Sequence, residues 1–286
     1  MKKIILLFSL FFIVDHAVSQ TREAKLLGYC TADQLQKEPY AGWYTPNVSG
    51  YKPNADILDR LKKVNTSNYS IKIFFGSWCG DSKRELPKMT KVLNEISFVK
   101  KSIALIAVDD STEVYKQSPQ REEAGLQIYK VPTFIIYEGS TEIGRIVESP
   151  AETIERDLLK IFSKRQYSSN YYTYPLVKGW LKEELLQDEN INVRGLAFQL
   201  KPIVLNESEL NSCAYVLMAQ ANLKEAIAIF RINANLFPQS ANCYDSLGEA
   251  YAKAGLKDKA IQSYEIALQL DPKNEGIQVR LRKLKS

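Results

Sequence analysis

The chain has 286 residues, which is enough for two compact domains, and 45% of them are hydrophobic, which excludes a mostly disordered protein. The 38 basic and 33 acidic residues give a formal net charge of +5, a mild and dispersed excess that does not favour nucleic-acid binding.

Residues 1–19 have the three parts of a secretory signal peptide. Lys2 and Lys3 form the charged region, residues 4–14 form an apolar core too short to span a bilayer comfortably, and Ala17-Val18-Ser19 supplies small residues for cleavage. We therefore expect export to the periplasm or the extracellular space, with no stable membrane insertion after cleavage near Ser19. An uncleaved membrane anchor is the alternative.

Cleavage would remove the single histidine, His16. Lys2, Lys3 and Asp15 are lost with it, so 36 of the 38 basic and 32 of the 33 acidic residues remain and the net charge becomes +4. A chain without histidine has no Cys–His pair, no Ser–His–Asp triad and no histidine metal site. Any catalysis must depend on cysteine, carboxylates, lysine, tyrosine or backbone dipoles, and we expect neither a metal nor a cofactor.

Residues 20–51 are polar, with scattered aromatic residues and turn signals at Pro46 and Gly50. We expect them to form an irregular amino-terminal arm that packs on the following domain.

Residues 52–163 alternate between helix and strand patterns. Asn54 can cap a short helix in which Ile57, Leu58 and Leu61 share one face. The later patterns predict strands over 71–75 and 103–108, helices over 82–97 and 151–162, a loop and helix over 113–128, and a hairpin of strands 134–137 and 142–148. This order predicts an α/β sandwich, with a central mixed sheet flanked by helices.

Residues 164–206 break this order and are expected to form a linker and an irregular helical segment. The sequence then repeats with a shift of 34 positions, which aligns Ala214 with Gly248 and Phe230 with Tyr264. The period and residue classes resemble tetratricopeptide repeats over 207–240 and 241–274. The resemblance implies an all-α domain whose groove binds a protein partner; a generic helical hairpin is the alternative. Because about three repeats are usually needed for stability, we expect helices within 176–206 and a capping helix over 275–285 to complete the stack.

A lone cysteine stands where the helix over 82–97 should begin. The apolar run 71–75 ends in Gly76-Ser77-Trp78 and leads directly to Cys79. Unpaired N–H groups at a helix start act as a partial positive charge and stabilise a thiolate. Together with Gly80-Asp81-Ser82, the motif resembles the Trp-Cys-Gly-Pro-Cys site of the thioredoxin superfamily, with Ser82 in place of the second, resolving cysteine.

Two further motifs support this resemblance. Pro87 lies eight residues after Cys79, where the family has a kinking proline, and Val131-Pro132-Thr133-Phe134 resembles the cis-proline loop opposite the active cysteine. A cis X–Pro bond leaves the preceding backbone free to pair with an extended substrate. The resemblance covers residues 52–163 and implies a thioredoxin-like fold. The site residues that it implies are the catalytic Cys79 and Ser82, and the substrate-binding Trp78, Gly80, Val131, Pro132 and Thr133.

The departures from the family limit the mechanism. Ser82 can donate a hydrogen bond to the Cys79 thiolate but cannot attack sulfur, Ile73 stands where the family has a buried acid, and Asp81 would disfavour the thiolate if it lay close. We therefore expect Cys79 to form mixed disulfides with a protein disulfide or thiol substrate, and to need an external thiol such as glutathione for release.

The other cysteines have weaker cases for chemistry. Cys30 could resolve a mixed disulfide only if the arm folds over the site, and a structural role is favoured. Cys213 and Cys243 lie on the first helices of adjacent repeats as small buried residues, and a disulfide between them stays open. Asp109-Asp110 fits a solvated strand end better than a metal site.

Three functions are compatible with these patterns. The first is monothiol thiol–disulfide exchange through Cys79 by an exported protein whose repeats recruit a protein partner. The second is a non-catalytic interaction module with a degenerate thioredoxin fold. The third is a thiol peroxidase-like activity, which we rank last because the threonine and arginine signature of peroxidatic sites is missing.

Overall fold

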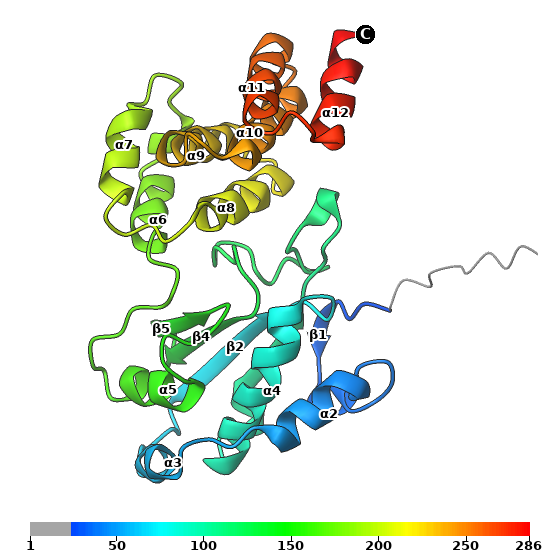
Figure 1. The fold of residues 1–286 in the computed structure, drawn as a ribbon. Coiled ribbons are helices and arrows are strands. Elements are labelled where there is room, and N and C mark those ends of the chain that lie inside the picture. Colours follow the sequence, from blue (N-terminus) through cyan, green and yellow to red (C-terminus); the bar gives the residue numbers. More distant parts are fainter. Residues whose placement is uncertain (1–23) are drawn as a thin grey trace, which may run out of the picture.

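The structure is a computed structural model and describes residues 24–286. The leader expected over residues 1–19 lies outside the described residues. Figure 1 shows a sheet-containing half below and an all-helical half above. No helix within residues 24–286 combines the length and the apolar character needed to cross a membrane.

Five strands form one mixed sheet in the order β1-β3-β2-β4-β5. Their bounds are β1 Gly28–Cys30, β2 Tyr69–Phe75, β3 Ile103–Ala107, β4 Thr133–Glu138 and β5 Thr141–Val147. β2 and β3 are parallel, whereas the β1–β3, β2–β4 and β4–β5 pairs are antiparallel. The expected mixed sheet and its hairpin are therefore confirmed.

One face of the sheet is covered by regular helices, and we call it the helix-covered face. The helices are α3 Ala55–Lys62, α4 Gly80–Glu95 and α5 Ile154–Phe162. Alternation along β2 directs Ile71, Ile73 and Phe75 into this core. Asn54 caps α3 as expected, because its Oδ1 accepts a hydrogen bond from Ile57 N at 3.1 Å.

Within residues 24–286, no regular helix of the sheet half packs on the opposite face, which we call the loop-covered face. Phe74, Ile106 and Ile135 pack there against Ile128 and Val131 of the segment between β3 and β4. That segment contains only a short 3₁₀ helix, η2 Thr112–Val114, with turns and bends around it.

The helix expected within 113–128 is therefore wrong. The segment folds differently because Lys116, Arg121 and Gln127 have φ values of 56°, 62° and 49°. A right-handed helix excludes such left-handed residues.

The amino-terminal arm is not irregular, which corrects the expectation for residues 20–51. It contains β1 and two helices, α1 Ala32–Leu35 and α2 Ala41–Gly50. α2 includes Pro46 and is held by tertiary contacts: Tyr44 is 2% exposed, and its hydroxyl donates to Thr90 Oγ1 on α4 at 3.1 Å. A local sequence pattern does not reveal such a helix, because its stabilising partners lie elsewhere in the chain.

Pro87 lies inside α4 and is buried. Because proline has no N–H, the carbonyl of Lys83 loses its helical partner. Asn47 Nδ2 of α2 donates to that carbonyl at 3.1 Å. The arm therefore supplies, from the Asn47 side chain, the hydrogen bond to Lys83 O that the backbone of Pro87 cannot donate.

The upper half consists of helices joined by short turns. They are α6 Tyr174–Lys182, the 3₁₀ helix η3 Leu185–Gln187, α7 Val193–Leu200, α8 Glu207–Ala219, α9 Leu223–Leu236, α10 Ala241–Lys253, α11 Lys257–Leu270 and α12 Glu275–Lys285. α6 and α7 share a buried core with α8 and α9, and Ile277 of α12 packs against Tyr264 of α11. A Cβ atom on Gly248 would lie 2.7 Å from the ring of Tyr264, so this small residue permits the close approach of α10 and α11.

The two halves are in contact on the loop-covered side. Tyr129 and Val147 of the sheet half belong to the same buried cluster as Cys213 of α8. Gln117 Nε2 donates to Ala219 O at 2.9 Å, and Lys130 Nζ contacts Ser208 Oγ at 3.2 Å. The helical half thus packs against the segment that covers the loop-covered face.

Candidate active site

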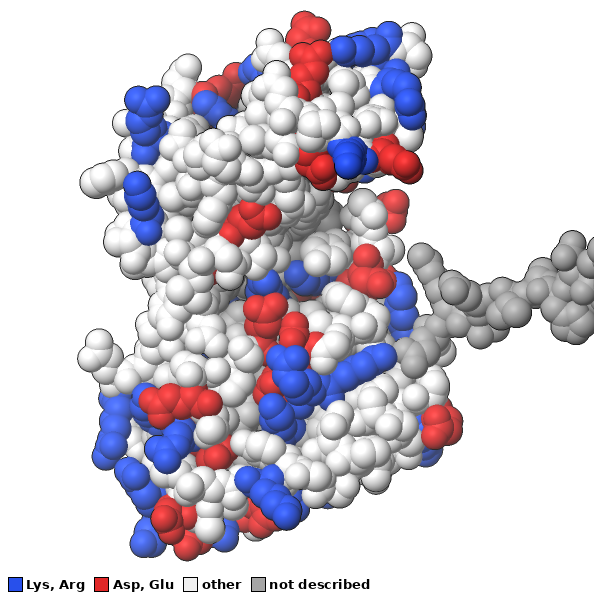
Figure 2. Space-filling model, viewed as in Figure 1, with Lys and Arg blue, Asp and Glu red and all other residues white. Residues whose placement is uncertain are grey.

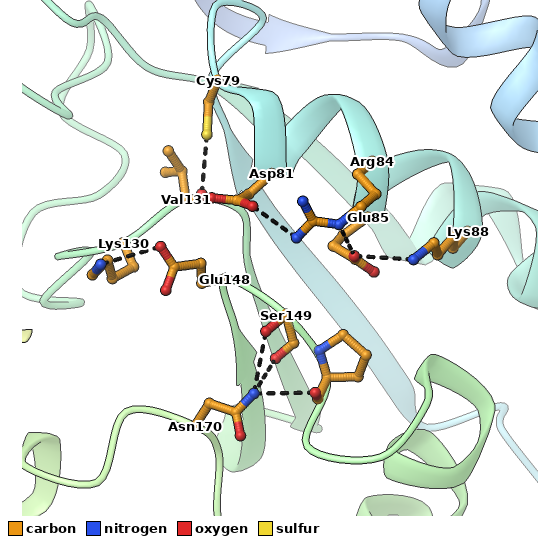
Figure 3. A network of polar contacts seen from close by, with 11 residues as sticks. Cys79, Asp81, Arg84, Glu85, Lys88, Lys130, Val131, Glu148, Ser149 and Asn170 are labelled. Atoms are coloured by element: carbon orange, nitrogen blue, oxygen red, sulfur yellow. Dashed lines mark hydrogen bonds and ion pairs between the residues drawn. The ribbon is translucent and has the colours of Figure 1, made fainter. Parts of the chain in front are cut away.

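Cys79 is the N-cap residue of α4, with an extended backbone (φ −86°, ψ 126°). Its side chain caps no N–H group of the helix; instead the sulfur donates to Val131 O at 3.3 Å, as Figure 3 shows. The thiol is half-exposed. The sulfur is therefore reachable from solvent and lies between the first turn of α4 and the loop that contains Val131.

Trp78 is fixed beside the thiol by its own hydrogen bond. Its Nε1 donates to Val108 O at the end of β3, at 2.9 Å. A Cβ atom on Gly76 would lie 2.5 Å from Cε2 of the indole, so only glycine at that position permits this placement of Trp78. Gly80 is exposed, with no atom within 4 Å of the place where its Cβ would be, and leaves the approach to Cys79 open.

Ser82 makes a different hydrogen bond from the one expected. It is fully buried, and its Oγ accepts from Gly76 N at 3.1 Å. Among residues 24–286, no hydrogen bond joins Ser82 to the sulfur of Cys79. Its contact holds the turn that carries Trp78, so the hydroxyl positions the loop.

Asp81 is neutralised within its own helix. Arg84 pairs with it at 2.7 Å and also with the buried Glu85 at 2.6 Å, and Lys88 pairs with Glu85 at 3.0 Å (Figure 3). These cations offset the negative charge that Asp81 adds near the start of α4.

The predicted cis-proline loop lies opposite Cys79, and its Val131-Pro132 bond is cis. Pro132 and Thr133 are buried; Thr133 Oγ1 donates to Lys130 O at 2.7 Å, and Pro132 O accepts from Glu148 N at 2.7 Å. The Val131 N–H has no hydrogen-bond partner in the described part of the chain. The loop is therefore held on both sides of Val131, and the N–H of that residue stays available.

The structure brings together all the predicted site residues: Cys79, Trp78, Gly80 and Ser82 around the start of α4, and Val131, Pro132 and Thr133 on the facing loop. The other cysteines are not part of this group. Cys30 packs into the core of the helix-covered face, where burial raises the pKa of its thiol to about 11. Cys213 and Cys243 are buried, and all four cysteines are free thiols.

Lys116 is a site neighbour that the sequence reasoning missed. It is 3% exposed, its Nζ donates to Tyr129 O at 2.6 Å, and it lies 4.4 Å from the centre of the Tyr115 ring. Burial, aided by the nearby charge of Lys130, lowers the pKa of its ammonium to about 7, while the charge of Cys79 acts in the opposite direction. No sequence signal marks it, since a lysine in a polar segment is normally a solvated residue.

A cavity of about 640 Å³ lies away from Cys79, on the side of the sheet where α2 and α4 pack, and Ile73 and Cys30 are among the residues that line it. The described residues contain no cluster of three or more potential metal ligands. Asp109 and Asp110 instead pair with Lys25 of the arm.

The comparison with known families identifies one part of the chain. A tetratricopeptide-repeat family model matches residues 241–274, which are α10 and α11. No curated protein matches the chain. Residues 241–274 are thus a tetratricopeptide repeat, a unit that supports binding of a protein partner. The interpretation of the sheet half depends on the geometry described above.

Proposed function

We propose that the chain is an exported thioredoxin-like protein that carries out monothiol thiol–disulfide exchange through Cys79. The observation that carries the proposal is the placement of the Cys79 sulfur at the start of α4, 3.3 Å from the carbonyl that precedes Pro132. The N–H of Val131 could then pair with a substrate strand whose disulfide faces the sulfur.

The exchange starts with the Cys79 thiolate as nucleophile. It attacks one sulfur of a substrate disulfide; the Cys79–substrate bond forms, the substrate S–S bond breaks, and the departing thiolate takes a proton from water. A low-molecular-weight thiol such as glutathione then attacks the mixed disulfide, and a second one completes the reduction. Two external thiols are oxidised to their disulfide, and one substrate disulfide is reduced to two thiols.

The sequence does not provide an internal resolving group, and the geometry of Cys30 does not supply one. Cys30 packs in the core of the helix-covered face, whereas Cys79 contacts residues of the loop-covered face. If a free thiol of the substrate attacks the mixed disulfide instead, the same first step gives isomerisation without net reduction. The signal-like residues 1–19 motivate a periplasmic or extracellular location, and the repeats would recruit the protein partner.

The matched repeat favours a second candidate function, a binding module without turnover. In that case the loop that contains Val131 would hold a bound segment, and Cys79 would take no part in exchange. The two candidates differ in the reactivity of one sulfur atom.

The test is the rate of Cys79 alkylation in the mature protein at a fixed pH, measured by mass spectrometry of the labelled peptide. We expect Cys79 to be labelled faster than the thiol of free glutathione. The Cys79→Ser variant serves as the control for labelling at other cysteines.

A reduction assay follows with a protein disulfide, with and without glutathione. Turnover is expected only with the added thiol, and the Ser82→Cys variant is expected to turn over with a dithiol reductant. An alkylation rate equal to that of free glutathione, together with no mixed disulfide, would leave only the binding module.

A further inference from the structure

A small cavity lies at the junction of the two halves. Its volume is about 280 Å³, and it is lined by Asp110, Thr112, Tyr115, Tyr215, Met218 and Glu249. The first three residues belong to the segment after β3, and the others belong to α8 and α10. Figure 1 shows this segment rising from the sheet toward α8.

The lining has the chemistry of a cation site. It contains two carboxylates and two tyrosines, and none of the lining residues is basic. Tyrosine faces attract a cation through their ring quadrupole, and carboxylates accept its hydrogen bonds. In the view of Figure 2, acidic side chains lie at the right-hand end of the waist between the two halves.

Glu249 is the lining carboxylate that has no ion-pair partner among residues 24–286. Its Oε2 accepts from the hydroxyl of Tyr215 at 2.9 Å, and no lysine or arginine among residues 24–286 forms an ion pair with it. Tyr215 and Glu249 occupy equivalent positions of consecutive repeats, so the repeat geometry itself brings them together. The hydroxyl donor does not neutralise Glu249, and the Arg280 guanidinium, which interacts with Glu249 electrostatically, makes its own hydrogen bonds to Asp245.

Asp110, the other carboxylate of the cavity lining, already pairs with an ammonium group. Lys25 of the arm pairs with Asp110 and lies 3.3 Å from Asp109. Lys25 does not line the cavity. Asp110 is therefore the weaker of the two acids for a new cation, and Glu249 is the stronger.

Tyr115 connects the cavity to the thiol. It lines the cavity, and the electrostatic effects on its phenol, after burial, come from Cys79 and then from Asp110. Lys116, the next residue, is held on the carbonyl of Tyr129, two residues before Val131. Contacts of neighbouring residues thus run from the cavity, through Tyr115 and Lys116, to the loop that contains Val131.

We propose that this cavity binds a lysine or arginine side chain of the protein whose disulfide is attacked by Cys79. The inference rests on the proposed function, because it defines the substrate class of the same site. Its volume lies just below the range of about 300–1,000 Å³ typical of small-molecule sites, which suits a single long side chain. The repeats then contribute directly to substrate choice.

The experiment uses Gly/Ser peptides whose single cysteine carries a thionitrobenzoate leaving group. The paired peptides differ only in arginine or norleucine, placed at successive positions on either side of the cysteine. Attack by Cys79 forms the mixed disulfide and releases thionitrobenzoate, which is measured by absorbance. We expect the best-placed arginine to accelerate capture by about tenfold, and Glu249→Gln to remove most of that preference.

Two matched variants define the site. Asp110→Asn should reduce the arginine preference less than Glu249→Gln, because Lys25 already shares Asp110. Glu275→Gln removes an exposed acid of α12 and should leave the preference unchanged. Circular dichroism and thermal melts establish that each variant is folded.

Binding is also measured without chemistry, by fluorescence anisotropy of labelled peptides in which serine replaces the cysteine. If Cys79 reacts with neither peptide but arginine-dependent binding persists and weakens in Glu249→Gln, the exchange mechanism fails and the cation site stands. If Cys79 reacts equally with both peptides and binding does not depend on arginine, the cation site is overturned while exchange stands. An equal loss of preference in Glu275→Gln would also overturn it, since a general charge effect would then explain the result.

Discussion

The two faces of the sheet are covered in different ways. Helices α3, α4 and α5 pack regularly on one face, whereas the other is covered by the segment between β3 and β4 and, beyond it, by the helical half. The regular cover buries long apolar side chains and the thiol of Cys30. The irregular cover brings polar groups, a buried lysine and the turn at Val131 close to Cys79. The larger apolar cluster of the sheet half thus lies on the first face, and the candidate site residues lie at the second.

The largest expected effect is on the helix-covered face. Leu158 of α5 is fully buried, so Leu158→Ala should lower the free energy of unfolding by about 2–5 kcal/mol. Chemical denaturation measures this loss. Under conditions where the variant remains folded, the alkylation rate of Cys79 should not change. Val99→Ala, at a position that is 41% exposed, is the matched control and should change stability by less than about 0.5 kcal/mol.

The next effect compares the thiols of the two faces. Burial raises the pKa of Cys30 to about 11, so that at about pH 7.5 it should be alkylated about 300-fold more slowly than an unperturbed thiol. Peptide mapping after timed labelling gives the rates of Cys30 and Cys79 in one experiment. Unfolding in denaturant should bring the two rates together. Equal rates in the folded protein would remove the distinction between the faces.

A smaller effect is expected at the turn before Cys79. An alanine at Gly76 would bring Cβ to 2.5 Å from the indole of Trp78, so Gly76→Ala should displace the ring and cost about 1–3 kcal/mol of stability. Tryptophan fluorescence and the rate of Cys79 capture should both change. The control is Gly42→Ala in α2, where no atom lies within 4 Å of the added Cβ. An unchanged fluorescence spectrum would contradict the packing of Trp78 on Gly76.

The smallest effect is a pH slope on the loop-covered face. Lys116 has a pKa of about 7 in the folded protein, below the reference value of about 10.4 that applies when the chain is unfolded. Between these values the unfolded state binds more protons, so stability should rise with pH, by at most about 1.4 kcal/mol per unit. Lys116→Met should reduce this slope between about pH 7 and pH 9.

The groups around Lys116 determine how large that slope is. The charge of Lys130 lowers its pKa further, and the charges of Cys79, Glu148 and Cys213 raise it. Equal slopes in the original protein and in Lys116→Met would mean that Lys116 stays charged after folding. Equilibrium unfolding at several pH values distinguishes these outcomes.

Elements with their own apolar period could be predicted from the sequence. β2, β3 and the β4–β5 hairpin are continuous or alternating apolar runs, and the repeats carry their own period of aligned small and aromatic residues. The site was predictable for a related reason, since Trp78, Cys79 and Pro132 lie in short motifs with fixed local geometry.

What could not be predicted depends on partners distant in sequence. α2 exists because Tyr44 and Asn47 contact α4, and β1 is a short edge strand that begins at Gly28 with φ 73°. Ser82 looked like a partner for sulfur, but its hydrogen bond to Gly76 N is set by the turn. The burial of Lys116 follows from the docking of the helical half, which no local pattern reports.

The hydrogen bond from Asn47 to Lys83 O has a consequence for how the sheet half could be fused to another protein. The sequence resemblance begins near residue 52, yet the helix that presents Cys79 is completed by a side chain that precedes this boundary. A fusion made by cutting at residue 52 would remove Asn47 and Tyr44 and leave a carbonyl in the middle of α4 without its donor. A transferable module therefore includes α2 of the arm, and α2 should be inherited together with the helix that presents Cys79 rather than exchanged independently.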